Sequence, residues 1–359
     1  MSVASRVVRP EILAMQAYHV ADAAGMVKLD VMESPYRLPP ALAAELGEAV
    51  SKLALNRYPV PTATELRALI RRVMQVPEGC DVLLGNGSDE CIQYVTAALA
   101  REGAVVMAPV PSFAMFAMHA LFYRLRFVGV PLREDFSLDI DAFLAAIEKE
   151  KPSLVWIAFP NNPTGNAFPV ADIERILRAA PGLVVVDEAY QPFAGATFMP
   201  RLAEFENLVV MRTVSKIGMA GLRLGYVCGR PEWIDAFNKT RSPFNVNVLT
   251  EAVAIRLLQH KGVLDAQAAE VLAERERVKA EIDRLDGLNV YPSAANFLLA
   301  RVAGGKGAGT RVFERMKRQG VLVKDFSGGH PSLENCLRLT IGTPDENRTM
   351  VAALREALK

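Results

Sequence analysis

Three polar side chains in the middle of the chain are of types that could do chemistry together. Asp187 directly follows the branched apolar run 183–186, Lys216 comes twenty-nine residues later, and Asn162 comes twenty-five residues before Asp187. A short run that is apolar throughout is typical of a strand buried on both faces of a parallel sheet, and ligands bind at the carboxyl ends of such strands. Taken alone, Asp187 could equally cap the next turn. Taken together, the three residues predict that an acid, an amine and an amide meet at one edge of a sheet.

An acid and an amine arranged in this way suit the chemistry of pyridoxal phosphate. This cofactor needs an amine to hold its aldehyde and an acid to keep its ring nitrogen protonated, so that the ring acts as an electron sink. Asn162 and Tyr190 could both donate hydrogen bonds to the phenolic oxygen of the ring. An asparagine before proline is also an ordinary turn residue, and an exposed lysine such as Lys216 is common, so the prediction depends on the whole set.

The order and spacing of four motifs resemble the fold-type I aminotransferases, and within them the histidinol-phosphate aminotransferases. The resemblance runs from about residue 18 to the end of the chain. It implies an α/β fold with a large, doubly wound, mostly parallel sheet domain and a smaller α/β domain at the carboxyl end. The motifs are Asn161-Asn162-Pro163-Thr164-Gly165, Asp187-Glu188-Ala189-Tyr190, Arg212-Thr213-Val214-Ser215-Lys216 and Gly221-Leu222-Arg223-Leu224-Gly225-Tyr226.

The resemblance assigns the catalytic work to three side chains. Lys216 would hold the cofactor covalently and then carry the proton of the substrate α carbon. Asp187 would pair with the protonated ring nitrogen, and Tyr190 would contact the phenolic oxygen. Phe113 would stack over the cofactor ring, where many relatives have tyrosine, although a phenylalanine packed in the core is the alternative.

A glycine turn supplies a candidate phosphate site. Gly87 and Ser88 lie between an expected strand at 82–85 and an expected helix at 91–99. A glycine lets backbone amides approach a phosphate, and the amino terminus of a helix adds N–H donors and a partial positive charge. An ordinary helix cap is the alternative, and Asp89 would cap or orient because two anions repel. The resemblance extends the set of cofactor-binding residues to Thr213, Ser215 and Arg223.

Cations near the carboxyl end of the chain are candidates for binding the substrate. Arg338 matches the arginine that grips the substrate carboxylate in the superfamily, and its planar guanidinium fits a carboxylate through two parallel hydrogen bonds. The resemblance adds Lys324, Asn162 and Tyr18, although Tyr18 could equally be a surface aromatic that packs the amino-terminal arm. The expected substrates are a phosphorylated amino alcohol and the pair glutamate and 2-oxoglutarate.

Three positions depart from the family pattern. Lys324 stands where histidinol-phosphate aminotransferases usually have arginine, which keeps the charge and loses the planar fork. Arg223 comes seven positions after Lys216, where the family spacing is often eight. Met32-Glu33-Ser34-Pro35-Tyr36 replaces a common Asn-Glu-Asn-Pro-Tyr sequence.

Tyr58 follows a helix-like run and precedes Pro59. It could simply pack within its loop. The resemblance implies instead that it reaches across a homodimer interface and gives its hydroxyl to the cofactor phosphate of the other subunit. Each active site would then need two chains.

Short apolar runs alternate with helical patterns along the chain, which predicts strands and helices of a parallel α/β sheet. We expect these elements to position the residues above. After residue 246 the pattern changes to long charged helices at 249–285. We therefore expect an amino-terminal arm at 1–40, a large cofactor-binding domain at 41–245 and a small domain at 246–359. The expected strands are 82–85, 104–107, 153–159, 183–186, 208–211, 321–324 and 337–342, and the expected helices of the large domain include 91–99 and 142–149.

Composition narrows the class of function. The length of 359 residues predicts about two domains, and the 51% of hydrophobic residues is enough to form their cores. A net charge of +1 argues against nucleic acid or a membrane surface as a partner. The four cysteines form no CxxC pair and the four histidines have no metal-binding spacing, so we expect no metal site. The sequence shows no secretory signal pattern near its start, and we expect a cytoplasmic protein.

The expected reaction moves an amino group between glutamate and imidazole-acetol phosphate, giving histidinol phosphate and 2-oxoglutarate, or runs in reverse, within histidine biosynthesis. An aromatic aminotransferase and a threonine-phosphate decarboxylase share these cofactor residues and stay open as alternatives. A regulatory protein that binds the cofactor without turnover is the alternative from another class, and Lys216, Asp187 and Arg338 argue against it.

Overall fold

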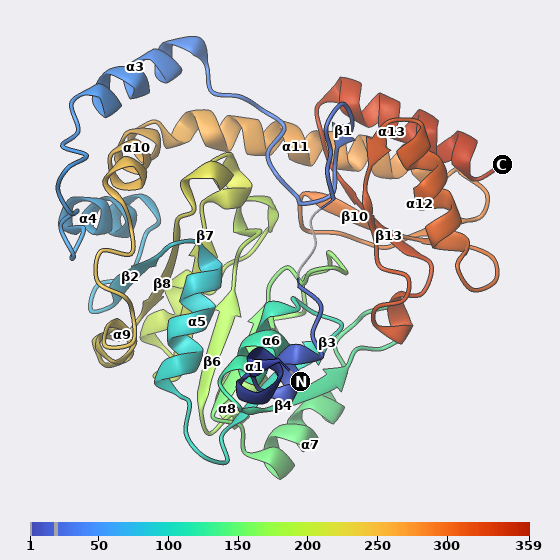
Figure 1. The fold of residues 1–359 in the computed structure, drawn as a ribbon. Helices are drawn as coiled ribbons and strands as arrows, with labels where there is room; N and C mark the ends of the chain where they lie inside the picture. The colour runs from blue at the N-terminus through green and yellow to red at the C-terminus, as the bar shows by residue number, and fades with distance from the viewer. Residues whose placement is uncertain (1, 18–20) are drawn as a thin grey trace.

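The computed structural model describes residues 2–17 and 21–359 and contains a large mixed sheet at the centre of the chain (Figure 1). The sheet has seven strands in the order β2-β8-β7-β6-β5-β3-β4, and β8 runs antiparallel to both of its neighbours while the other central pairs are parallel. The strands are β2 Asp81–Gly85, β3 Val105–Val110, β4 Arg126–Pro131, β5 Leu154–Ala158, β6 Leu183–Asp187, β7 Leu208–Thr213 and β8 Gly225–Gly229.

Helices cover both faces of this sheet because its central strands are apolar on both sides. In β5, Leu154 and Trp156 pack with the core cluster on one face, and Val155 and Ile157 pack with the cluster on the other face. Every residue of β5 and β6 is buried, as expected for the inner strands of a doubly wound sheet. One face carries α5 Ser88–Ala98, α6 Met115–Phe122 and α9 Pro231–Asn238, and the other carries α4 Thr64–Val73, α7 Ile140–Glu150, α8 Val170–Ala179 and α10 Val248–Gln259.

A second, smaller sheet lies in the carboxyl-terminal third of the chain. Its order is β12-β13-β10-β9, and every pair is antiparallel. Three helices pack on it through a separate core cluster. The elements are β9 Leu288–Val290, β10 Phe297–Val302, β12 Lys324–Asp325 and β13 Cys336–Thr340, with α11 Lys261–Ile282, α12 Ala308–Arg318 and α13 Pro344–Ala357.

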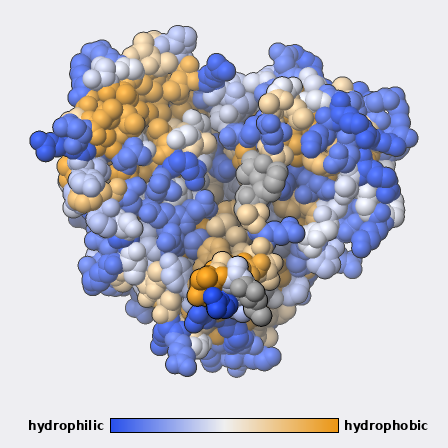
Figure 2. Space-filling model, in the orientation of Figure 1, coloured by the Kyte–Doolittle hydropathy of each residue, from blue (hydrophilic) through white to orange (hydrophobic). Residues whose placement is uncertain are grey.

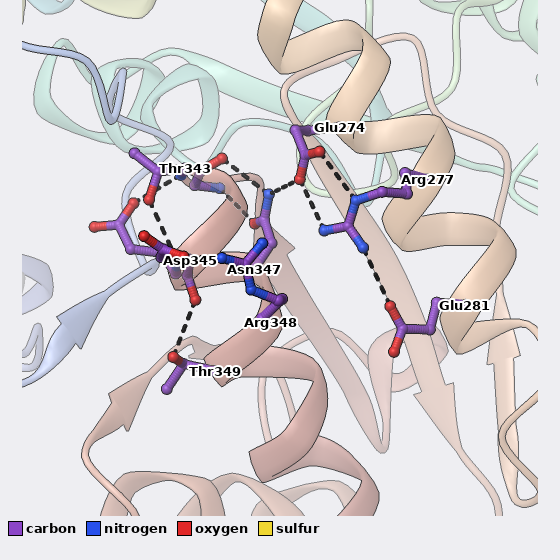
Figure 3. Close-up of polar contacts among 10 residues, drawn as sticks. Glu274, Arg277, Glu281, Thr343, Asp345, Asn347, Arg348 and Thr349 are labelled. Atoms are coloured by element: carbon purple, nitrogen blue, oxygen red, sulfur yellow. Dashed lines mark hydrogen bonds and ion pairs between the residues drawn. The ribbon is translucent and has the colours of Figure 1, made fainter.

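Polar contacts fasten the long helix α11 to the start of α13 (Figure 3). The Nδ2 atom of Asn347 donates to Glu274 at 2.9 Å, and Arg277 pairs with Glu274 at 2.8 Å and with Glu281 at 3.2 Å. Thr343 begins α13 with a capping box, which satisfies the first amides of the helix. The bond between Asn347 and Glu274 joins α11 to α13, and the pairs of Arg277 hold Glu274 within α11.

The amino-terminal segment reaches both sheets. It contains α1 Val3–Val7, α2 Pro10–Leu13 and α3 Pro40–Ser51. Between α2 and α3, the short strand β1 Val27–Lys28 pairs in parallel with β11 Val321–Leu322, and residues 31–33 after it lie at the carboxyl ends of β5, β6 and β7. Short 3₁₀ turns complete the fold at Gln191–Phe193, Met199–Ala203, Ser215–Ile217, Ala220–Leu222 and Pro331–Leu333.

The structure differs from the expected elements at two places. The expected strand 321–324 is divided at Val323, because β11 pairs with β1 while β12 pairs with β13. The helices expected after residue 246 are present, and the difference is that α10 contributes Ala254, Leu257 and Leu258 to the core of the large sheet.

The division of the chain at 41–245 and 246–359 stays a prediction. Leu264 of α11 packs in the first core and Val271 packs in the second, so the packing favours a change of domain within α11. No helix in residues 2–17 and 21–359 is long and apolar enough to cross a membrane.

Candidate active site

A pocket of about 220 Å³ lies at the carboxyl ends of β5, β6 and β7. This is where an α/β sheet with this topology binds its ligands. Most of the expected cofactor-binding residues line it: Ser88, Asp89, Phe113, Asn162, Asp187, Tyr190, Thr213, Ser215, Lys216 and Arg223. Residues that the sequence analysis did not select also line it: Val31, Met32, Glu33, Ala158, Pro160, Ala189 and Ala220.

Lys216 projects into this pocket from the 3₁₀ turn that follows β7. Its Nζ atom donates to the backbone oxygen of Val31 at 3.1 Å and lies 6.0 Å from the centre of the Tyr190 ring. Burial, followed by the charge of Arg338, lowers the pKa of the Lys216 amine to about 8. A lysine with this pKa has a substantial neutral fraction near pH 8, and only the neutral amine is a nucleophile or a base.

Asp187 ends β6 and is buried at the floor of the pocket, with 5% of its surface exposed. Its Oδ1 atom accepts a hydrogen bond from the amide of Ala189 at 3.0 Å. Burial raises the pKa of Asp187 to about 7, against the lowering effect of that hydrogen bond. A cation placed against this carboxyl group would favour its ionised form and reverse the shift.

Gly87 and Arg223 shape one end of the pocket. Gly87 has φ +84° and precedes α5, and a Cβ atom added to it would lie 2.6 Å from Nη2 of Arg223. Arg223 also reaches Asp89, at 3.5 Å, and both side chains are about half exposed. The first amides of a helix have no partner within the helix, so this end presents N–H groups beside a guanidinium, a good setting for a phosphate.

Hydroxyl groups complete the same end. The Oγ1 atom of Thr213 and the Oγ atom of Ser215 are 2.8 Å apart, and Thr213 also donates to the backbone oxygen of Leu224 at 3.2 Å. Gly225 opens β8 against this turn, and a Cβ atom there would lie 2.4 Å from the amide nitrogen of Ser88. The close approach of the two backbones places β8 directly behind the start of α5.

Asn162 has a defined orientation because its Oδ1 atom accepts from Nη1 of Arg338 at 2.6 Å. The Nδ2 group of the same amide is left as a donor. The neighbouring Asn161 accepts from Ser112 at 2.8 Å and donates to the backbone oxygen of Pro111 at 3.0 Å. These bonds tie the loop that carries Asn162 to the loop that carries Phe113.

Arg338 lies in the centre of β13 and is buried. Its Nη2 atom donates to the backbone oxygen of Asp30 at 2.7 Å, and its guanidinium lies 5.4 Å from the ring centre of Phe297 and 5.2 Å from that of Phe326. Lys324 is directly opposite Arg338 in the β12–β13 pair, although it does not line the pocket. The two cations therefore share one face of the smaller sheet.

Tyr58 is not brought to this pocket. Its side chain is 81% exposed and stacks on Phe244, with ring centres 4.6 Å apart. Figure 2 shows an apolar area over the part of the molecule where Figure 1 places α3 and α10. Other exposed apolar residues of the loop before α4 and of α10 are Leu55, Val60 and Leu249. Tyr18 lies outside the described residues.

The segment 30–33 contributes to the pocket through its backbone, which residue types did not indicate. The backbone oxygens of Asp30 and Val31 accept from Arg338 and Lys216, and Asn296 donates to the backbone oxygen of Met32 at 3.1 Å. Every residue has a backbone oxygen, so residue types do not show which of these oxygens accept hydrogen bonds in the pocket. Only the position of this segment after β1 could have indicated its role.

No group of three or more histidine, cysteine, aspartate or glutamate side chains within residues 2–17 and 21–359 could hold a metal ion. The four cysteines are free and buried.

Comparison with known proteins identifies the family. The model of the class I and II aminotransferases matches residues 24–354. The chain belongs to the class I and II aminotransferases. It is 55% identical to histidinol-phosphate aminotransferase 2 of Cupriavidus pinatubonensis, over 100% of this chain and 98% of that protein. It is 50% identical to the histidinol-phosphate aminotransferase of Chromobacterium violaceum, over 98% of this chain and 97% of that protein.

A solved structure of this aminotransferase family shares the fold. The histidinol-phosphate aminotransferase of Sinorhizobium meliloti, in complex with pyridoxal 5′-phosphate, is 25% identical to this chain, with a TM-score of 0.87 over 98% of this chain and 97% of that one. The family expected from the four motifs and the expected fold class are both confirmed.

The residues in the pocket of this aminotransferase fit pyridoxal phosphate. The space beside Gly87 and Arg223 suits a phosphate, and the buried carboxyl group of Asp187 suits a protonated ring nitrogen. The amine of Lys216 lines the same pocket and suits an aldehyde. A phosphate, a cation and an aldehyde are the three polar features of this one cofactor.

Proposed function

We propose that the chain is a pyridoxal-phosphate-dependent aminotransferase that converts histidinol phosphate and 2-oxoglutarate to imidazole-acetol phosphate and glutamate, a step of histidine biosynthesis. The observation that carries this proposal is that the Lys216 amine, with its lowered pKa, and the buried carboxyl group of Asp187 line one pocket. The similarity to histidinol-phosphate aminotransferases along the whole chain supports the choice of substrates.

The chain's own residues hold and orient the cofactor in this proposal. Gly87, Ser88, Thr213, Ser215 and Arg223 bind its phosphate, and Asp89 orients Arg223. Asp187 fixes the proton on the ring nitrogen, and its own charge is then stabilised by that partner. Phe113 covers the ring, and Asn162 and Tyr190 donate to the phenolic oxygen.

The proton step belongs to Lys216. Pyridoxal phosphate, when bound, supplies an aldehyde for the amino group and a ring that delocalises the electron pair left on the substrate α carbon. The neutral Nζ atom of Lys216 would take the proton from that carbon and pass it to the cofactor carbon that receives the amino group, and the reverse half-reaction would move the proton back along the same route. A pKa near 8 suits both directions, because the amine accepts and releases a proton close to neutral pH.

Two cations hold the anionic groups of the substrates. Arg338 grips the carboxylate of glutamate or the phosphate of histidinol phosphate in turn, by exchanging its bond to the backbone oxygen of Asp30 for the ligand. Lys324 adds positive charge when the larger phosphate is bound, since it lies directly opposite Arg338 in the sheet. Tyr18 is proposed to line the same substrate site.

We also infer that the active enzyme is a homodimer with shared active sites. The exposed Tyr58 stacks on Phe244 and lines a groove with residues of α3 and α10. It would pack against a second copy together with the apolar surface over these helices, and would donate to the cofactor phosphate there. An exposed apolar surface of this kind is typical of an interface. Free, buried cysteines suit the reducing cytoplasm, where we place the enzyme.

A panel of amino donors tests the reaction. Purified enzyme, loaded with pyridoxal phosphate, is mixed in single-turnover experiments with histidinol phosphate, glutamate, phenylalanine or threonine phosphate, and the visible absorbance of the cofactor is followed. We expect conversion with histidinol phosphate and glutamate, and no release of carbon dioxide. Rapid conversion of phenylalanine with none of histidinol phosphate, or carbon dioxide from threonine phosphate, would contradict the proposal.

A further inference from the structure

A buried ion pair lies behind the active site, on the reverse face of the large sheet. The Nε and Nη2 atoms of Arg212 approach Oε2 of Glu188 at 2.9 and 2.8 Å, and the two side chains are 7% and 0% exposed. The single hydroxyl proton of Thr197 is shared between the two carboxylate oxygens, which lie 2.9 and 2.8 Å from Oγ1, and the same hydroxyl accepts from Nη2 of Arg212 at 2.8 Å. The amide of Phe198 adds a further donor to Oε1 of Glu188, at 2.5 Å. Both oxygens of this carboxylate are therefore held by hydrogen-bond donors.

The pair joins the two strands that carry the reacting groups. Glu188 directly follows β6, Arg212 is the penultimate residue of β7, and the two strands are paired in parallel through Asp187 and Met211. The amide of Glu188 also donates to the backbone oxygen of Met211 at 2.8 Å. The ion pair thus joins β6 and β7 through their side chains at the point where their backbone pairing ends.

Each member of the pair is the chain neighbour of a residue that lines the active site. Side chains alternate between the faces of a strand, so Asp187 and Thr213 face the pocket while Glu188 and Arg212 face away from it. Val186 and Val210, two residues before them, belong to the core cluster on that reverse face.

The same alternation extends to β8. Tyr226 is paired with Arg212 in the β7–β8 register and is buried in the reverse core, and its neighbour Gly225 packs against the amide of Ser88. A polar layer across three strand ends therefore lies directly behind the residues proposed to hold the ring nitrogen and the phosphate.

We propose that Glu188 and Arg212 are positioning residues, which fix the backbone at Asp187 and Thr213 so that the carboxyl group and the hydroxyl group meet the cofactor in one fixed geometry. The inference rests on the proposed function, because it assigns Asp187 and Thr213 to the cofactor. Neither Glu188 nor Arg212 touches the reacting atoms. Stability alone does not account for a pair of this kind, since apolar residues of similar size often replace a buried ion pair without loss of stability.

The test separates positioning from stability by comparing a single and a double substitution. Arg212→Met leaves the Glu188 charge buried without its partner, so the melting temperature should fall sharply. Glu188→Leu combined with Arg212→Met removes both charges, and the melting temperature of the cofactor-free double variant should return close to that of the parent. Its dissociation constant for pyridoxal phosphate should nevertheless remain raised by about tenfold, because misplaced groups lose part of their interaction.

Kinetics supply a second readout that a purely structural role would not move. The double variant should convert bound substrate more slowly by about tenfold in single turnovers, while its apparent affinity for histidinol phosphate changes little, because Arg338 is untouched. The matched control is Glu174→Leu with Arg201→Met, which removes an ion pair of 2.6 Å that lies away from the pocket. This control should keep the parental cofactor affinity and turnover.

The result that overturns the inference is a double variant with the cofactor dissociation constant and turnover of the parent. If the double variant does not fold, Thr197→Val carries the test, since it removes only the hydroxyl group that bridges the pair. That variant should raise the cofactor dissociation constant severalfold, and parental affinity overturns the inference. A parent that binds pyridoxal phosphate without transferring amino groups contradicts the proposed function alone, because the affinity comparison still stands.

Discussion

Replacing Gly87 with alanine should weaken cofactor binding through Arg223. The added Cβ atom would lie 2.6 Å from Nη2 of Arg223, too close for van der Waals contact, so the guanidinium must move. A charged hydrogen bond is worth about 1.5–3 kcal/mol, and its loss corresponds to a change of about tenfold to a hundredfold in the dissociation constant for pyridoxal phosphate. The φ of +84° adds backbone strain, which lowers the stability of the folded chain independently.

Gly79→Ala is the matched control, because Gly79 has φ +77° but an added Cβ atom there meets nothing within 4 Å. Both variants should lose stability in thermal melts of the cofactor-free chain, and only Gly87→Ala should lose cofactor affinity in equilibrium titrations. Combining Gly87→Ala with Arg223→Ala should add little to the loss of either alone, because both remove one interaction. A Gly87→Ala chain with parental affinity would refute the reasoning, as would an equal loss in Gly79→Ala.

Three further predictions concern charge and assembly. Asp187→Asn should stabilise the cofactor-free chain at pH 8. Folding raises the pKa of the Asp187 carboxyl group from 3.8 to about 7, so this group lowers the free energy of unfolding increasingly between those pH values. The gain in melting temperature from the substitution should therefore vanish near pH 4. Arg338→Ala should impair both half-reactions, whereas Lys324→Ala should slow the histidinol-phosphate half by about thirtyfold, or about 2 kcal/mol, and the glutamate half much less; equal losses in Lys324→Ala would show that it does not discriminate. Mixing inactive Lys216→Ala chains with Tyr58→Phe chains should regenerate some activity if sites are shared, and full activity of Tyr58→Phe alone would remove the reason for that proposal.

Much of the large sheet could be predicted because its strands are short and wholly apolar. The run 183–186 became β6, with Asp187 as its last residue, and the run 153–159 became β5 with one residue removed at each end. A strand that is buried on both faces is apolar at nearly every position, so it can be recognised in the sequence. The division of 321–324 between two sheets could not be predicted, because strand partners depend on contacts with β1, almost three hundred residues earlier.

The site was predictable where side-chain type determines chemistry. Lys216, Asp187 and Asn162 line one pocket, as their spacing and the family motifs indicated. The backbone oxygens of Asp30 and Val31 escaped prediction, because any residue type offers the same acceptor. The role proposed for Glu188 and Arg212 also needed the structure, since only the register of β6 and β7 shows that they meet.

The identity of the lysine that holds the cofactor is the most direct test of the account. Enzyme loaded with pyridoxal phosphate is reduced with borohydride, digested with trypsin and mapped by mass spectrometry. The pocket geometry predicts one adduct, on Lys216 within the peptide 213–223, because its amine has a lowered pKa and lies beside Asp187 and Tyr190. An adduct on any other lysine, with cleavage after an unmodified Lys216 giving the peptides 213–216 and 217–223, would contradict the assignment of Lys216.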